Sequence, residues 1–162
     1  MSKKNNVTRF LESEGVSYKA HTIPSKKLSA IEVSHYLQLP PQQVFKSIVL
    51  EGEKEKKGLL AVVPATCEVN PKKVAKNAGL KKVKVASLRA AETRTGLQAG
   101  GISPLALINK GFRIFLDKSA KNHSTIVISA GERGLQIEIN PNVVIRLTGA
   151  GLGGLCYQTS GV

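Results

Sequence analysis

The chain has 162 residues, of which 41% are hydrophobic, and 24 Lys and Arg residues against 11 Asp and Glu residues give it a net charge of +13. We expect one domain over residues 1–162, because this length can bury a substantial core and no apolar run approaches the ~20 residues of a membrane helix. The polar start, MSKKNNVTRF, differs from a signal peptide, so we expect a cytoplasmic protein with no membrane partner, and its basic surface favours polyanions.

Short helices and strands alternate at the start of the chain. An amphipathic segment that stops at Gly15 predicts a helix, and "VSYKAHTI" over 16–23 predicts a strand. Ser29 and Glu32 form an S-x-x-E capping box, which predicts the start of a second helix. The two prolines at 40–41 must end that helix.

The middle of the chain carries a strand pair. The apolar, β-branched runs "VFKSIVL" (44–50) and "LLAVVPA" (59–65) predict two paired strands joined by a charged loop. Asn70 before Pro71 is typical of a helix start, because asparagine caps the first N–H groups and proline fits the first helical position. A strand, "KKVKVA", and a helix over 87–93 are expected to follow.

Three more strands are expected in the last third, "FRIFLD", "STIVISA" and "LQIEIN", with the last two joined by the turn "GERG" (131–134). Asn140 and Pro141 repeat the helix-start signal, and Gly149 is the expected stop. The stretch "GAGLGG" (149–154) matches G-x-G-x-x-G only formally, because it follows a helix instead of a strand. The sequence leaves open whether this glycine-rich tail is ordered.

These elements predict the fold class. About six or more strands mix with short helices without a regular βαβ rhythm, which favours an α+β domain. We expect the strands to form a mixed, partly closed sheet.

The cysteines and histidines give no sign of a metal site. Cys67 and Cys156 are far apart and lack ligand spacing, so we expect two small apolar fillers instead of a disulfide or a zinc site. The histidines, His21, His35 and His123, are scattered. We therefore expect no metal site.

Lys46 is the exceptional residue of its strand. A charged side chain in an apolar strand has a desolvation cost unless it reaches solvent or meets an anion. One interpretation is an outward-facing lysine at the sheet edge. The other is a lysine that holds the oxygen of an ester or phosphate.

The segment from Gly100 to Pro104, "GGISP", joins two flexible residues to a rigid one. It fits either a tight turn or a shaped loop whose free N–H groups face a ligand's oxygen atoms. Neither Ser103 nor Ser129 lies in a G-x-S-x-G nucleophile elbow, so an acyl-serine mechanism has little support.

Positive charge gathers between Pro71 and Arg94, where Glu92 is the single acidic residue. Such a cluster is either a solvated face or a phosphate-binding surface. The lysines that we expect to bind RNA are Lys72, Lys73, Lys76, Lys81 and Lys82.

Three ordered motifs point to a family. "FKS" at 45–47, "GGISP" at 100–104 and "SAGERGLQIEINP" at 129–141 resemble the YbaK/EbsC family of aminoacyl-tRNA deacylases, relatives of the editing domain of bacterial prolyl-tRNA synthetases. The similarity extends over nearly the whole chain and includes "YKAHTI" near the start. The resemblance implies a mixed, barrel-like sheet surrounded by short helices. It also implies hydrolysis of the ester that joins a wrong amino acid to the 3′ end of a tRNA, with no metal or organic cofactor.

The resemblance also implies roles for individual residues. Catalytic roles fall on Lys46, Gly101 and Ser103. Substrate-binding roles fall on Phe45, Ser47, Gly100, Ile102, Pro104, Ser129 and Gly131. The implied partners are mischarged tRNA(Pro) and prolyl-tRNA synthetase.

The amino acid removed is a separate question. Cysteine is the first expectation, with the substrate's own thiol taking part in its release, and alanine is the alternative because Gln136 is neutral. Two rival interpretations are a tRNA-binding module without catalysis and a basic regulatory protein with a vestigial pocket. Binding without turnover would separate either rival from the enzyme.

Overall fold

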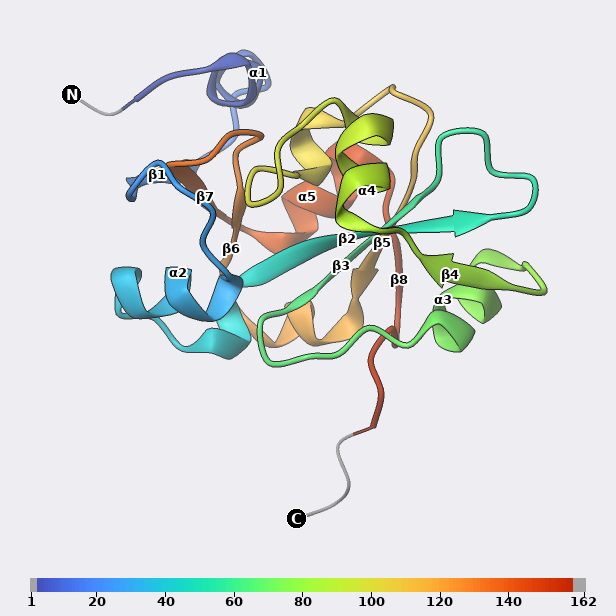
Figure 1. Ribbon diagram of the computed structural model, residues 1–162. Coiled ribbons are helices and arrows are strands. Elements are labelled where there is room, and N and C mark those ends of the chain that lie inside the picture. The colour runs from blue at the N-terminus through green and yellow to red at the C-terminus, as the bar shows by residue number, and fades with distance from the viewer. Residues whose placement is uncertain (1–2, 159–162) are drawn as a thin grey trace.

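The structure is a computed structural model that describes residues 3–158. Its described residues form eight strands and five α-helices, and Figure 1 shows the helices around two sheets. The α+β prediction is therefore confirmed.

The larger sheet has five strands in the order β4-β2-β3-β5-β8. β3 pairs antiparallel with β2 and parallel with β5, so the sheet is mixed as predicted. The bounds of its strands are β2 Phe45–Gly52, β3 Leu59–Pro64, β4 Val83–Val85, β5 Arg113–Asp117 and β8 Gly151–Gly153.

The smaller sheet is antiparallel, in the order β1-β7-β6. Its strands are β1 Tyr18–Thr22, β6 Ile126–Ser129 and β7 Leu135–Ile139. A parallel bridge between Val44 and Val127 joins the start of β2 to β6 and so connects the two sheets. This junction gives the fold its partly closed character.

The helices begin where the capping signals predict. The Ser29 side chain accepts from the Glu32 N–H in a complete capping box, and Asn70 and Asn140 cap the helices that begin at the following prolines. The α-helices are α1 Asn6–Ser13, α2 Ala30–Leu37, α3 Pro71–Ala78, α4 Leu88–Thr95 and α5 Pro141–Thr148. Short 3-10 turns are η1 Pro41–Gln43, η2 Pro104–Ala106 and η3 Lys118–Asn122.

β3 is the centre of the core, because all six of its residues are buried. Leu60 and Val62 pack with residues of α1, β6 and β7, whereas Leu59 and Ala61 pack on the opposite side with residues of α3. The two packed faces place β2, the neighbour of β3, in a rigid position.

The glycine-rich tail is ordered over its described part, which the sequence left open. Gly151–Gly153 forms β8, parallel to β5, and a Cβ at Gly151 would lie 3.0 Å from the Phe115 ring. Three residues with two glycines give no alternation that could predict a strand. Residues 159–162 of the tail lie outside the described residues.

The expectation of two unpaired, filler cysteines is wrong. Cys67 and Cys156 form a disulfide with a Cα–Cα distance of 5.8 Å, although 89 residues separate them in sequence. The fold brings them together because the segment after β8 runs beside the segment after β3, with the Tyr157 N–H donating to the Glu68 carbonyl. Sequence spacing does not reveal this proximity.

No helix in the described part of the chain is long and apolar enough to cross a bilayer.

We predict that the Cys67→Ser/Cys156→Ser double variant is less stable to urea than the oxidised protein by about 2–4 kcal/mol. The disulfide closes a long loop and so lowers the entropy of the unfolded chain. Urea unfolding with and without a reductant measures the effect, and the reductant should not change the double variant. Equal urea midpoints for the oxidised protein and the variant would contradict the prediction.

Candidate active site

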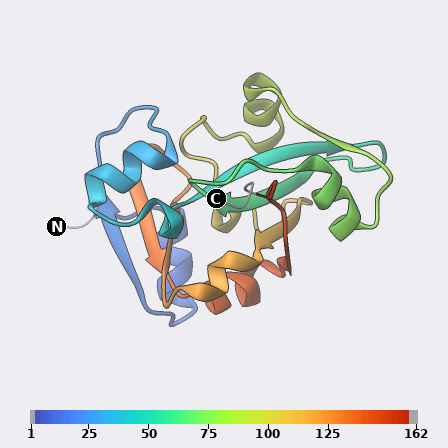
Figure 2. The same cartoon turned by 90° about the horizontal axis from the view of Figure 1, so that it is seen from below.

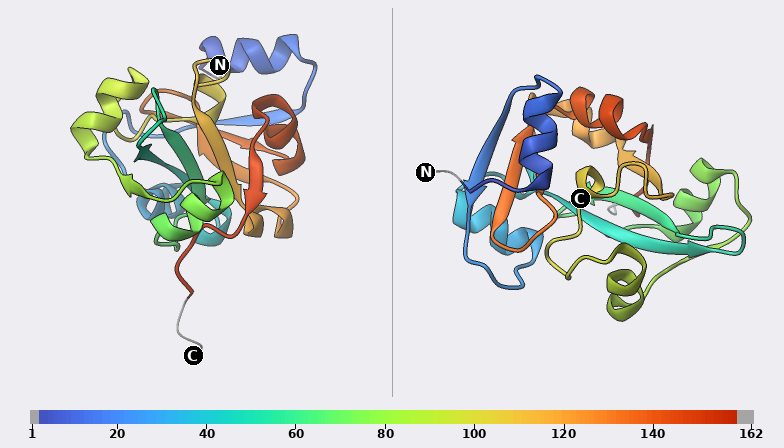
Figure 3. Two further views of the ribbon diagram at one scale, coloured as in Figure 1. Left: turned by 90° about the vertical axis from the view of Figure 1, so that its right-hand side faces the viewer. Right: turned by 90° about the horizontal axis from the view of Figure 1, so that it is seen from above.

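A pocket of ≈ 410 Å³ opens between α2, the start of β2 and the segment 96–103. This volume is typical of small-molecule sites. Figures 2 and 3 show the segment 96–103 between α2 and α4, with β2 beside it. The pocket is thus built from elements that are distant in the sequence.

Lys46, the second residue of β2, lines this pocket. Its Nζ donates to the Ala65 carbonyl at 3.4 Å, so the ammonium group is held beside the end of β3. Partial burial lowers the pKa of Lys46, and the nearby Glu68 carboxylate opposes that shift. The result is a partly desolvated cation with N–H groups still available to a ligand.

Ser129 and Gln136 form a polar floor of the pocket that Lys46 lines. They are paired across β6 and β7, line the pocket and are 9% and 5% exposed. The Ser129 hydroxyl accepts from the Gly131 N–H at 3.3 Å, so its own O–H can donate to a ligand. The Gln136 amide makes no side-chain hydrogen bond within residues 3–158, which leaves a neutral donor and acceptor at the floor.

The glycine-rich loop contributes Gly100 and Ile102 to the pocket lining. Neither N–H donates to a protein acceptor within the described range, so both could serve an oxyanion. The Gly101 N–H differs, because it donates to the Gln98 carbonyl at 2.8 Å. Gly101 is instead required by packing, since a Cβ there would lie 2.9 Å from the Cα of Glu132.

Ser103 and Pro104 lie behind the loop. Ser103 is completely buried, and its hydroxyl accepts from the Leu105 N–H at the start of η2. Pro104 is the first residue of that turn and is also buried. The structure does not bring the Ser103 hydroxyl, for which the sequence predicts catalysis, to the pocket, and its visible role is a cap.

Of the remaining predicted substrate-binding residues, two line the pocket and one lies behind it. Phe45 and Ser47 line the pocket next to Lys46. Gly131 does not line it, but it has a φ of +93° and donates to Ser129 from the turn behind the floor.

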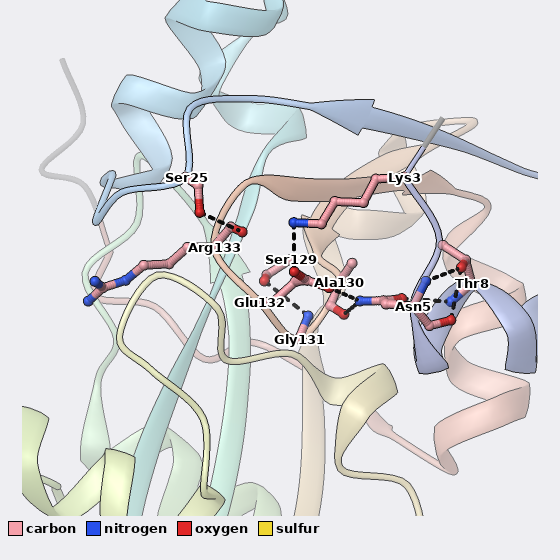
Figure 4. Close-up of polar contacts among 9 residues, drawn as sticks. All are labelled: Lys3, Asn5, Thr8, Ser25, Ser129, Ala130, Gly131, Glu132 and Arg133. Atoms are coloured by element: carbon pink, nitrogen blue, oxygen red, sulfur yellow. Dashed lines mark hydrogen bonds and ion pairs between the residues drawn. The ribbon is translucent and has the colours of Figure 1, made fainter. Parts of the chain in front are cut away.

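The turn 131–134 is fixed by the N-terminal segment, as Figure 4 shows. Glu132 forms an ion pair with Lys3 at 2.8 Å and accepts from the Asn5 side-chain amide at 2.9 Å. The same amide of Asn5 donates to the Ala130 carbonyl. The hydrogen bond from Lys3 holds the pKa of Glu132 below its ordinary value of 4.5.

Sequence reasoning did not predict the pocket wall formed by α2 and its neighbours. Lys27 and the first turn of α2, including Ile31, line the pocket, as does Leu88 of α4. Ile31 and Leu88 are 38% and 56% exposed, so they form an apolar part of the rim. The capping box located the start of α2, but no one-dimensional pattern shows that this helix lies opposite Lys46.

No lysine of the basic cluster lines the pocket. Lys72, Lys73 and Lys76 stand on α3, and Lys81 and Lys82 precede β4. β4 pairs with the far end of β2, where Lys84 lies opposite Glu51, about 15–20 Å along the strand from Lys46. A ligand that touches both the pocket and the β4 end of the sheet must therefore be long.

No group of three or more His, Cys, Asp or Glu side chains that could hold a metal occurs within the described residues.

The comparisons with known proteins agree with this geometry. A model of the aminoacyl-tRNA editing domain matches residues 25–147, which include the pocket and both loops. The chain belongs to this family. Its members are aminoacyl-tRNA deacylases, so the resemblance inferred from the motifs is confirmed.

Relatives in sequence fall into two groups. EbsC of Enterococcus faecalis, described as a candidate Cys-tRNA(Pro)/Cys-tRNA(Cys) deacylase, is 36% identical over 90% of this chain and 89% of its own length. The proline–tRNA ligase of Dechloromonas aromatica is 30% identical over 72% of this chain but only 20% of the ligase. The chain thus corresponds to nearly all of EbsC and to about a fifth of the ligase.

Solved structures share the fold at lower identity. A candidate trans-editing enzyme for prolyl tRNA synthetase has a TM-score of 0.80 and 22% identity, with 96% of this chain and all of that chain covered. The hypothetical protein APE2540 has a TM-score of 0.82 and 18% identity over 94% of this chain. These structures support the fold that positions the pocket.

We predict that Glu132→Gln lowers stability at neutral pH by less than about 1 kcal/mol, the range of exposed ion pairs. Because folding lowers the pKa of Glu132, its stabilising contribution is full above 4.5 and is lost as pH falls through the folded-state pKa. The difference in melting temperature between wild type and Glu132→Gln should therefore shrink between pH 7 and pH 3. A difference that grows on acidification would contradict this assignment.

Proposed function

We propose that this editing-domain protein is a free-standing deacylase that removes a small amino acid, cysteine first, from mischarged tRNA(Pro). The observation that carries the proposal is the partly desolvated Lys46 that shares a pocket with a small polar floor. The similarity to EbsC along nearly its whole length supports action as a separate protein. Prolyl-tRNA synthetase is the proposed partner, since it would produce the mischarged tRNA.

The proposed mechanism needs no protein nucleophile. An aminoacyl ester is already activated, so a positioned water and stabilisation of the developing oxyanion can suffice. The Lys46 ammonium holds the aminoacyl end, and the free N–H groups of Gly100 and Ile102 are the backbone donors that the glycine-rich loop adds to the pocket lining. Gly101 and Ser103 then act by shaping the loop, not by touching the ester.

The floor is the basis for substrate choice. Ser129 and Gln136 are neutral and buried, so the floor fits a small, uncharged side chain and offers no carboxylate to a cationic one. One methylene in a pocket discriminates by only about 1–3 kcal/mol, so cysteine, alanine and serine should all enter. Participation of the substrate's thiol would then make the hydrolysis of Cys-tRNA faster than that of Ala-tRNA or Ser-tRNA.

The experiment is a panel of one tRNA(Pro) transcript charged with cysteine, alanine, serine or proline. We predict that single-turnover hydrolysis releases cysteine much faster than serine, its closest isostere, because the thiol takes part. Equal rates for these two would contradict thiol participation, and preferential release of alanine would assign the protein to alanine editing.

A panel with tRNA binding but no hydrolysis would overturn the enzyme proposal and favour a tRNA-binding module. The basic regulatory alternative predicts binding to RNA regardless of a 3′ amino acid. Each charged transcript incubated without the protein serves as the control for spontaneous hydrolysis.

We further propose that Lys72, Lys73, Lys76, Lys81 and Lys82 bind tRNA phosphates. The triple variant Lys72→Ala/Lys73→Ala/Lys76→Ala, with all three changes on α3, should bind tRNA more weakly than wild type. The slope of log affinity against log salt should fall by about 0.7–0.9 per lost phosphate contact.

The matched control carries the same loss of charge elsewhere. Lys19, Lys110 and Lys121 are exposed and lie on other segments, so their triple alanine variant should keep the wild-type slope. Equal slopes for both triple variants would contradict this proposal and indicate that tRNA binds another face of the protein.

A further inference from the structure

Arg133 is attached to the rim of the pocket by the glycine-rich loop. Its Nε donates to the Ala99 carbonyl at 2.8 Å. Its Cγ and Nε lie 3.7 and 3.8 Å from the position that a Cβ on Gly100 would occupy. The side chain therefore crosses Gly100, which itself lines the pocket.

The outer end of this guanidinium makes no polar contact with the described residues of the protein. The two Nη groups have no hydrogen-bond or ion-pair partner within residues 3–158, and Figure 4 shows the side chain leading away from the turn. The neighbouring carboxylate, Glu132, is engaged by Lys3 and Asn5 instead. Arg133 thus keeps a full charge and four N–H donors in one fixed plane.

Such a group matches a phosphate. Guanidinium donates two parallel N–H bonds to a phosphate, and anchoring through Nε removes part of the entropic cost of holding the fork in place. Lys27 lines the same rim, with its Cα 3.6 Å from the position that a Cβ on Gly100 would take, and adds a second cation. Two basic residues, Arg133 and Lys27, therefore adjoin Gly100.

We infer that Arg133 binds the phosphate of the terminal nucleotide of the tRNA. The inference rests on the proposed function, which places the ester at Lys46 and Gly100. In an aminoacyl-tRNA one ribose separates that ester from the nearest phosphate, and Arg133 stands just across Gly100 from the pocket. No lysine of α3 lines the pocket, so in this proposal those lysines bind other phosphates of the tRNA.

The test is a binding cycle that does not depend on turnover. Uncharged tRNA(Pro) and the same transcript without its terminal nucleotide, hence without that phosphate, are titrated with wild type and Arg133→Ala. We expect Arg133→Ala to weaken binding of the full transcript by about tenfold or more and to leave binding of the truncated transcript unchanged. Arg133→Lys should recover part of the loss, because it keeps the charge without the fork.

Arg146 of α5 provides the matched control, since it is an exposed arginine on another element. Arg146→Ala should bind both transcripts like wild type, and thermal unfolding checks the fold of each variant. Equal weakening of both transcripts by Arg133→Ala, or no weakening of either, would overturn the inference. Failure of the proposed hydrolysis would appear separately, as an absence of deacylation by the wild type.

Discussion

The site depends on the close approach of two loops. Gly101 lies against the backbone of Glu132, at a distance that leaves no room for a Cβ. This contact fixes the glycine-rich loop relative to the turn that follows β6, and the Arg133 bond to the Ala99 carbonyl closes the same junction. One loop lines the pocket and the other joins the strands of the polar floor, so their junction fixes the glycine-rich loop relative to that floor.

The larger sheet supplies the rigid partner of these loops. β3 is buried along its length and holds β2 in register, so Lys46 emerges from a strand that cannot easily move. Burial then lowers the pKa of the lysine, while Glu68 favours the charged form. A fixed and partly desolvated cation stabilises a developing negative charge more strongly than a mobile, hydrated one.

Local signals in the sequence predicted the elements and part of the pocket. Capping residues located the helix starts at Ser29, Asn70 and Asn140, and the ordered motifs identified Lys46, Gly100 and Ser129 as pocket residues. Contacts between distant segments were missed, because spacing along the chain does not report them. The Cys67–Cys156 disulfide, the wall formed by α2 and the packing role of Gly101 all belong to this class.

The central claim is that Lys46 holds the aminoacyl ester during hydrolysis. The most direct measurement is the single-turnover deacylation rate of Lys46→Ala on the mischarged tRNA that wild type clears fastest, with a far-UV spectrum as a check of folding. The account predicts a rate lower by roughly 10²–10³, as for the loss of one oxyanion contact, in a protein that remains folded. A near-wild-type rate in the folded variant would contradict it.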